Sequence, residues 1–227
     1  MQQTFLRLGE KMLKKIKNNW LSYILIIGTT GWAFTQIDSL PDLIPSHFNI
    51  HGSPDEYGDK YINIVLLPLI NLFTILFLSF SSKVSPKNYE MNNSQNLIKI
   101  FNLGITVFLM AVYLGVILEA KFPLSGAFAN IIIPALAIFM IFIGNYFGKL
   151  ERNFFIGIRI PWTISSEVNW LKTHRFAGKI FVTGGLLLFM ISLFKLPIWY
   201  GFLVLIMALV ASIVFSLYYF LRFERQT

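Results

Sequence analysis

Histidine and acidic residues gather in one short stretch of the chain, at positions 38–60. His47 and His51 lie four residues apart, and Asp55 and Asp59 follow at the same spacing. Imidazole nitrogens combined with carboxylate oxygens are ligands that suit zinc. This stretch is therefore the first candidate for a metal site.

A His-x3-His pair places both rings on one side only in a helix. Asn49, Gly52 and Pro54 disfavour a helix here and favour turns. We therefore expect polar contacts that fix a loop, and we predict neither a bound metal nor a cofactor. Apolar and aromatic residues inside the stretch predict an ordered loop that folds back on the helix ends.

A second group of polar residues, between Asn153 and Gly178, could support proton transfer. Glu167 and His174 lie seven positions apart, on one face of a helix, as an acid and a base would need. The chain contains no H-E-x-x-H, no G-x-S-x-G and no Gly-rich phosphate loop. We therefore predict a protein that is not an enzyme.

The same segment places cations beside large aromatic side chains. Arg159 and Arg175 accompany Trp162 and Trp170. Guanidinium groups in this setting could bind phosphate headgroups or an acidic cytosolic partner. Simple anchoring of a basic loop at the membrane surface explains them equally well.

The element expected to carry these residues is an amphipathic helix in the plane of the membrane surface. Pro161 precedes it, Thr163 or Ser165 can cap it, and Gly178 ends it. Its apolar stripe consists of residues at i, i+4 and i+7: Ile164, Val168 and Leu171.

The composition identifies the class of protein. Of the 227 residues, 56% are hydrophobic and 13% are charged, and the mean hydropathy is +0.64. Soluble domains carry about 25% charged residues. The chain is therefore predicted to be an all-α membrane protein. It contains no cysteine, which excludes disulfides and thiolate chemistry.

A membrane-spanning helix needs about 20 apolar residues. Six runs qualify: 20–37, 61–80, 98–118, 128–147, 177–196 and 198–221. The basic segment 1–19 is predicted to be a short amphipathic helix before a retained signal anchor, with a cleaved signal peptide as the alternative.

Lysine and arginine alternate strongly between the predicted loops. With the N-terminus inside, only Lys60, Lys121 and Lys195 of the 19 basic residues lie outside. This bias predicts that both termini are cytosolic, and it explains the net charge of +8 without direct binding to nucleic acid.

Polar residues within the apolar runs are mostly asparagines. They are Asn63, Asn71, Asn102, Asn130 and Asn145. We interpret them as hydrogen-bonding contacts between helices, with a polar path through the bundle as the alternative. No ionisable residue lies deep in a run, which disfavours an ion-coupled transporter. Gly144-x3-Gly148 and Gly28-x2-Gly31 are predicted to allow close helix contacts.

Two motifs carry a resemblance to a known family. The first consists of Asn153, Gly157, Arg159, Pro161, Trp162, Thr163, Glu167, Trp170, His174, Arg175 and Gly178. It resembles the signature of the SdpI family, bacterial membrane proteins named for immunity to a toxin peptide. The second consists of Pro45, His47, Asn49, Gly52, Asp55, Gly58 and Lys60. It resembles an uncharacterised domain that often precedes the SdpI segment.

The resemblance implies two parts, residues 1–90 and the SdpI-like 91–227. It also implies a multi-pass protein of the bacterial plasma membrane that gives immunity to a secreted, membrane-active toxin peptide. In that family the protein is also thought to act as a receptor that holds a cytosolic transcriptional repressor at the membrane. The outer loop would then face the toxin, and the inner motif would face lipid or a regulator. A transporter and a metal-dependent membrane enzyme remain the alternatives.

Overall fold

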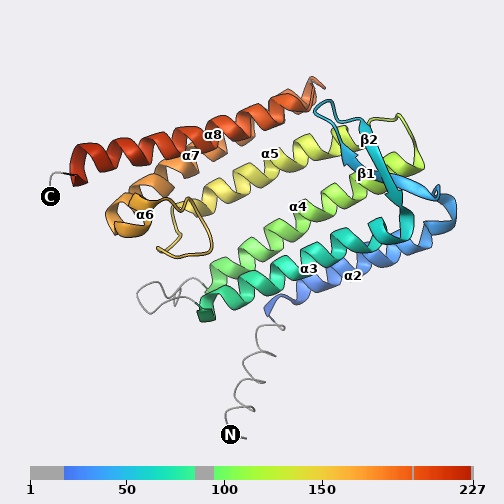
Figure 1. Cartoon of the computed structure of the whole chain (residues 1–227), viewed down its shortest axis with the longest axis horizontal. Helices are drawn as coiled ribbons and strands as arrows, with labels where there is room; N and C mark the ends of the chain where they lie inside the picture. The colour runs from blue at the N-terminus through green and yellow to red at the C-terminus, as the bar shows by residue number, and fades with distance from the viewer. Residues whose placement is uncertain (1–17, 85–94, 196, 226–227) are drawn as a thin grey trace, which may run out of the picture.

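Long helices run side by side along the longest axis of the molecule (Figure 1). The computed structural model describes residues 18–84, 95–195 and 197–225. The long helices are α2 (Trp20–Thr35), α3 (Lys60–Val84), α4 (Gln95–Lys121), α5 (Ala127–Phe147), α7 (Glu167–Leu193) and α8 (Trp199–Tyr219). The described residues also contain three short helical elements: η1 (Ile37–Ser39), α6 (Pro161–Ser165) and the π-helical turn η3 (Phe220–Glu224).

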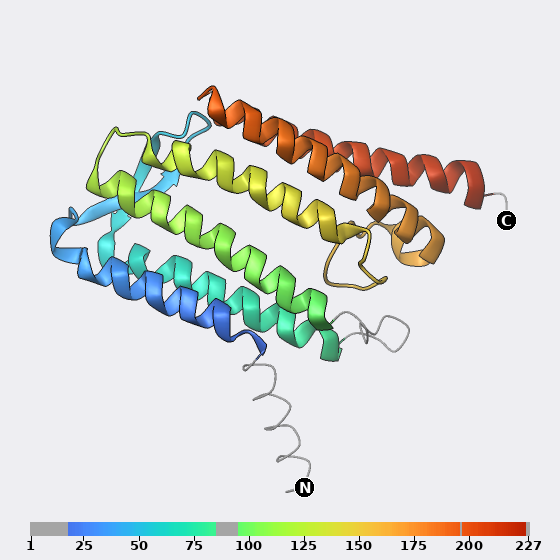
Figure 2. The same cartoon turned by 180° about the vertical axis from the view of Figure 1, so that it is seen from behind.

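Five of the described helices are long and apolar enough to cross a membrane: α3, α4, α5, α7 and α8. The predicted class, an all-α membrane protein, is confirmed. Helix α2 has 16 residues and packs against α3 and α4 (Figure 2). The sixth span and the orientation remain predictions. The amphipathic helix predicted before α2 falls mainly on residues 1–17, outside the described residues.

Glycine brings the backbones of α5 and α7 into direct contact. A Cβ atom added to Gly144 would lie 2.7 Å from the carbonyl oxygen of Gly178. One added to Gly185 would lie 2.7 Å from the carbonyl oxygen of Ala137. The close contact predicted at Gly144 is therefore confirmed. The contact predicted at Gly28 and Gly31 is wrong, because a Cβ atom added to either glycine would meet no atom of another described element within 4 Å.

The prediction of a separate in-plane helix ending at Gly178 is wrong. Helix α7 continues without a break through Gly178 to Leu193, and this glycine serves the contact with α5 instead of a helix end. The cap is Ser166, whose Oγ accepts a hydrogen bond from the backbone N–H of Asn169 at 3.1 Å. A short helix, α6, precedes it.

The predicted apolar stripe of this segment faces away from the other helices. Val168 and Leu171 are exposed, whereas Asn169, Thr173 and His174 are buried. The physical reason is the surrounding lipid. Where the surroundings are apolar, polar side chains turn toward other helices to find hydrogen-bond partners.

Polar side chains join the start of α2 to α3 and α4, and a second contact joins α3 to α4. Near the α2 start, the Asn102 Nδ2 donates to Asn19 Oδ1 at 3.0 Å and to Ser79 Oγ at 3.2 Å. Farther along, Thr106 Oγ1 donates to Asn71 Oδ1 at 3.3 Å. The predicted interhelical role of Asn71 and Asn102 is confirmed.

Helix α3 contains a proline whose missing hydrogen bond is replaced from a neighbouring helix. Pro68 has no N–H to donate to the carbonyl of Ile64, four residues earlier. The hydroxyl of Tyr113 in α4 donates to this carbonyl at 3.1 Å. The proline therefore remains inside an apolar helix without leaving this carbonyl unsatisfied.

Between α2 and α3 the chain forms a β-hairpin of β1 (Leu43–Phe48) and β2 (Pro54–Asp59). The sequence predicts a turn-rich loop here, so the strands are a correction. Pro45 and Pro54 obscured them, although proline is tolerated in edge strands and at strand starts. The predicted folding back onto the helix ends is confirmed, since Ile44 is fully buried with Ile64 and Ile117.

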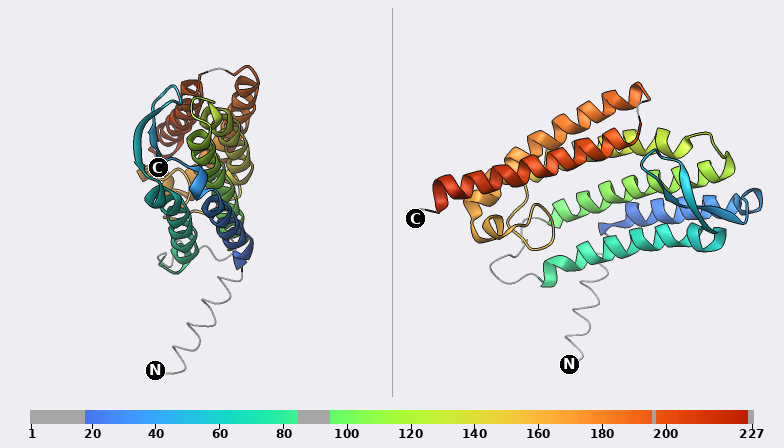
Figure 3. Two further views of the ribbon diagram at one scale, coloured as in Figure 1. Left: turned by 90° about the vertical axis from the view of Figure 1, so that its right-hand side faces the viewer. Right: turned by 45° about the horizontal axis from the view of Figure 1, so that its top comes forward.

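The hairpin and the loop 148–160 occupy opposite ends of the bundle (Figure 1). With the hairpin end toward the viewer, the hairpin lies against one side of the bundle (Figure 3). We call these the hairpin end and the loop end.

Candidate functional site

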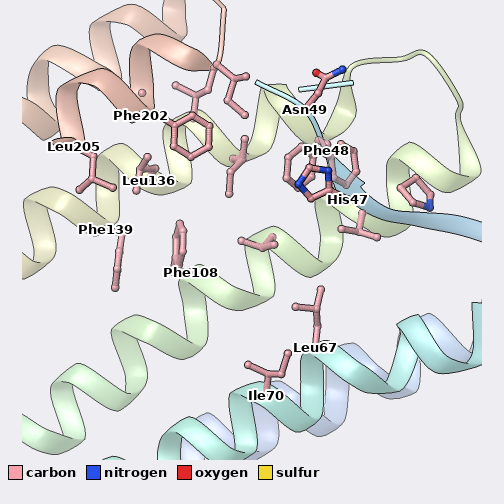
Figure 4. A pocket seen from close by; sticks show the side chains of 18 of the residues that line it. His47, Phe48, Asn49, Leu67, Ile70, Phe108, Leu136, Phe139, Phe202 and Leu205 are labelled. Carbon is pink, nitrogen blue, oxygen red and sulfur yellow. The ribbon is translucent and has the colours of Figure 1, made fainter. Parts of the chain in front are cut away.

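An apolar groove of about 650 Å³ lies beneath the hairpin, among α3, α4, α5 and α8 (Figure 4). Aromatic rings form much of its surface. Phe108 of α4 and Phe139 of α5 stack with ring centroids 4.6 Å apart. Phe202 of α8 and Ile70 of α3 contribute from the two sides. The groove is large enough for a bulky apolar ligand.

The groove becomes polar at its hairpin end. Phe48 of β1 stacks on Phe128 of α5 at 3.6 Å, which anchors the hairpin to the helix beneath it. His47, Asn49 and Asn63 line the groove beside this stack. A ligand lying along the groove therefore meets apolar side chains over most of its length and polar ones at the hairpin.

His47 is held in place by Asp55 across the hairpin. Its Nδ1 and the Asp55 Oδ1 are 2.6 Å apart, although both side chains are exposed. The hydrogen bond to Asp55, followed by the negative charge of this residue, raises the pKa of His47 above its ordinary value. His47 also lies opposite Glu56 in the strand register, so its ring faces an acidic strand.

The structure brings together only some of the predicted toxin-facing residues. Pro45, His47 and Asn49 line the groove. The other four shape the hairpin around it: Asp55 binds His47, Gly52 has a φ of +80° at the turn, Gly58 lies against Asn63, and Lys60 pairs with Asp42 at 3.1 Å.

Metal-ligating side chains do not converge at the hairpin. Throughout the part of the chain that the structure describes, no three His, Asp or Glu side chains form a group that could hold a metal ion. His51 and His47 lie on different surfaces, since His51 lines a smaller cavity with Asn130 and Lys195.

At the loop end, Asn153 organises the loop 148–160. Its side chain is fully buried, and its Oδ1 accepts hydrogen bonds from the backbone N–H groups of Phe155 and Ile156 at 2.8 and 2.7 Å. Its Nδ2 donates to the carbonyls of Glu151 and Ile156. One amide side chain therefore satisfies four backbone groups of an otherwise irregular loop.

Trp170 and His174 fasten this loop to α7. The Trp170 Nε1 donates to the carbonyl of Leu150 at 2.7 Å, and the His174 Nε2 accepts from the backbone N–H of Ile158 at 3.0 Å. The His174 Nδ1 lies 2.8 Å from the carbonyl of Trp170, which fixes the proton on Nδ1. Both rings are buried and stacked at 4.0 Å.

Gly157 permits the close approach of the loop to His174. Its φ is +117°, and an added Cβ would lie 2.4 Å from the His174 Nε2. Thr163 completes the arrangement, because its Oγ1 donates to the carbonyl of Ile158 at 2.8 Å and accepts from the N–H of Ile160 at 3.0 Å.

The remaining motif residues lie outside this buried cluster. Glu167 is exposed in the first turn of α7, so it does not meet the buried His174. Arg159 and Arg175 are exposed, and Arg159 donates to the carbonyl of Phe154. Pro161 begins α6, and Trp162 stacks on Phe220 with ring centroids 6.0 Å apart.

Two protein families match separate parts of the chain. Residues 149–219 match the SdpI/YfhL protein family, and residues 24–72 match a domain of unknown function, DUF1648. The Immunity protein SdpI of Bacillus subtilis (strain 168) is 26% identical over 211 residues, which cover 90% of this chain and 97% of that protein. No solved structure matches the chain.

The chain carries an SdpI-family segment behind a DUF1648 domain. With its five apolar helices, it is a multi-pass bacterial membrane protein. Both matched segments contribute to the groove. Ile70 comes from the DUF1648 segment, and Phe202 and Leu205 come from the SdpI-family segment.

Sequence reasoning did not find the groove aromatics or a second polar network. Asn169 Nδ2 donates to Glu224 Oε2 at 3.2 Å, and Ser216 Oγ donates to Asn169 Oδ1 at 2.7 Å. Ser166 Oγ is 2.5 Å from Glu224 Oε1. The sequence does contain a signal for this network. Glu224 closely follows an apolar run, and a carboxylate near the membrane surface needs a polar partner.

Proposed function

We propose that this protein protects the cell that makes it against a secreted, membrane-active peptide toxin. The observation that carries the proposal is the similarity to the Immunity protein SdpI, which extends over 90% of this chain. The similarity includes both motif regions. The groove beneath the hairpin supports it, since it offers an apolar surface beside polar groups at one end of the bundle.

In this proposal the toxin meets the hairpin end of the protein. Pro45, His47 and Asn49 contact the peptide directly, because they line the groove. Asp55, Gly52, Gly58 and Lys60 hold the hairpin in the shape that presents them. The membrane lipid and the toxin are therefore the two partners on this side.

The direct test is the survival of toxin-sensitive cells that express the chain. We expect growth at toxin concentrations that arrest cells carrying an empty vector. Gly157→Ala should remove this protection, because the variant is expected to be destabilised, whereas Gly28→Ala should keep it. Equal killing of cells with the native chain and with the empty vector, at matched membrane expression, would refute immunity for that toxin.

We further propose that the loop end reports toxin binding to a cytosolic transcriptional repressor. Arg159, Lys172 and Arg175 are exposed there and are available to an acidic surface. A tagged candidate repressor from the same organism should move to the membrane fraction when toxin is added. Triple replacement of these cations by glutamine should abolish the movement without reducing survival.

A further inference from the structure

We propose that the groove takes an amphipathic peptide from within the bilayer, with its apolar segment between α3 and α8 and its basic end at the acidic hairpin. This inference rests on the proposed function, because it specifies which chemistry the toxin presents and where it binds. Three features of the described residues support it: the lateral opening of the groove, its gradient of polarity and the charge at its hairpin end.

The groove opens sideways onto the apolar surface of the bundle. Leu66 and Ile70 of α3 and Phe202 of α8 line it, yet they are 47%, 43% and 48% exposed. These helices are long and apolar enough to span the membrane, so their exposed side chains face lipid. A ligand can therefore enter from the bilayer without crossing water.

Polarity along the groove follows the polarity of a membrane leaflet. Its far part is lined by apolar side chains such as Phe139, Met140 and Phe181. Its polar lining residues are concentrated at the hairpin: Ser46, His47, Asn49 and Asn63. A ligand with an apolar segment and one polar end fits this gradient, with the polar end at the surface.

Charge at the hairpin end favours a cationic ligand. The described acidic residues at this end are Asp38, Asp42, Asp55, Glu56, Asp59 and Glu119. The described basic residues are Lys60, Lys121 and Lys195, and Lys60 is paired with Asp42. Glu56 is exposed on β2 and lies opposite the groove-lining His47 in the strand register. Acidic side chains repel an anionic lipid headgroup and attract a basic peptide end, which favours a basic peptide over an anionic phospholipid.

The absence of cysteine from the whole sequence makes a direct test possible. The full chain is reconstituted in nanodiscs of phosphatidylethanolamine and phosphatidylglycerol, with bimane on Leu205→Cys in the groove. Met207→Cys is the matched control, since Met207 is 61% exposed at a similar depth on α8 and does not line the groove. The probe is a synthetic leucine–alanine helix of about 20 residues with two lysines at one end.

We expect saturable quenching or a spectral shift at position 205 and none at position 207. The lysine-ended probe should bind about tenfold more tightly than the same helix ending in two glutamates, and added salt should reduce this preference. Glu56→Gln should reduce the preference, whereas Glu167→Gln, exposed at the loop end, should leave it unchanged. Equal signals at 205 and 207, no preference for lysine, or a signal that depends only on lipid composition would refute the proposal.

An assay of cell survival in toxin distinguishes failure of the groove proposal from failure of the proposed immunity function. Leu205→Trp should fill the groove and abolish protection, whereas Met207→Trp should not. If folded Leu205→Trp protein, checked by its unfolding midpoint in detergent, still protects cells fully, the groove proposal is wrong and immunity stands. If the native chain binds the probe at position 205 but protects against no toxin, immunity fails and the groove proposal stands.

Discussion

At the scale of single residues, the loop end depends on one glycine. Gly157 adopts a φ of +117°, and its α-carbon faces His174 so closely that a methyl group would lie 2.4 Å from the Nε2. The same nitrogen accepts the hydrogen bond from Ile158 that fastens the loop to α7. A side chain at position 157 would therefore cause both backbone strain and steric overlap at the contact between the loop and α7.

We predict that Gly157→Ala destabilises the purified protein by about 2–4 kcal/mol, combining backbone strain with overpacking. Unfolding in mixed detergent micelles measures this change. Gly28→Ala is the matched control, because an added Cβ there meets no atom within 4 Å. Alanine in a helix should be neutral or slightly stabilising. Equal stability of the Gly157→Ala variant and the native protein would contradict the described contact.

The His47–Asp55 pair predicts a pH dependence at the hairpin. The pKa of His47 is raised above 6.5 by its bond to Asp55 and by the charge of this carboxylate. A raised pKa in the folded state means that the pair stabilises the hairpin fully below pH 6.5. This contribution disappears as the pH rises through the raised pKa.

Hydrogen exchange of the β1–β2 amides should therefore be slower below pH 6.5 than above the raised pKa, after correction for the intrinsic pH dependence of exchange. Asp55→Asn should lower the pKa of His47 toward its ordinary value, as measured by NMR titration of labelled histidine. His51, which has no bond to Asp55, serves as the internal reference. An unchanged His47 titration in Asp55→Asn would exclude the pair.

Residues of the loop-end motif could be recognised in the sequence, but their positions in the fold could not be predicted. Trp170 and His174 were recognised in the motif but predicted at the membrane surface, and both are buried. The indole and imidazole groups predict polar contacts. Their partners, however, are the backbone groups of Leu150 and Ile158, and a residue of any type carries such backbone groups. Contacts to backbone leave no side-chain signal in the sequence, so the position of the loop could not be predicted.

At the scale of elements, α3 and α4 are joined where Pro68 interrupts hydrogen bonding within α3. The hydroxyl of Tyr113 satisfies the carbonyl of Ile64 that proline leaves free. We predict that Tyr113→Phe destabilises the protein by about 0.5–2 kcal/mol, the range for hydrogen bonds between membrane helices. Unfolding in mixed detergent micelles again provides the measurement.

A double-mutant cycle isolates this contact. Pro68→Ala restores an N–H that can donate to Ile64 within α3, so Tyr113→Phe should matter less in this background. If Tyr113→Phe has the same effect with and without Pro68, the hydroxyl does not compensate for the proline.

The five described helices that are long and apolar enough to cross a membrane were predictable, because lipid requires long apolar runs. The continuation of α7 past position 178 could not be predicted. Cations and tryptophans before position 178 are typical of a surface helix, yet the helix continues because Gly178 packs on Gly144 of α5. The hairpin was missed for a related reason. Its strands are short and rich in proline, and their stability depends on Ile44 and Phe48 packing onto helices.

At the scale of the whole molecule, charge separates the two ends of the bundle. The described basic residues at the loop end are Lys99, Lys149, Arg152, Arg159, Lys172, Arg175, Lys179, Arg222 and Arg225. The described acidic residues there are Glu151, Glu167 and Glu224. The hairpin end has the opposite balance. Since basic loops remain on the cytosolic side, the fold predicts that the hairpin faces outward.

Single cysteines test this orientation, because the native chain offers no thiol that could react in the background. Glu56→Cys at the hairpin should react with a membrane-impermeant maleimide in intact cells. Arg159→Cys at the loop end should react only after permeabilisation. Both positions are exposed, so access to the thiol depends on the compartment rather than on burial. Labelling of both cysteines in intact cells would place the two ends in one compartment. That outcome would refute an outward hairpin combined with a cytosolic loop, although the two lie at opposite ends of the bundle.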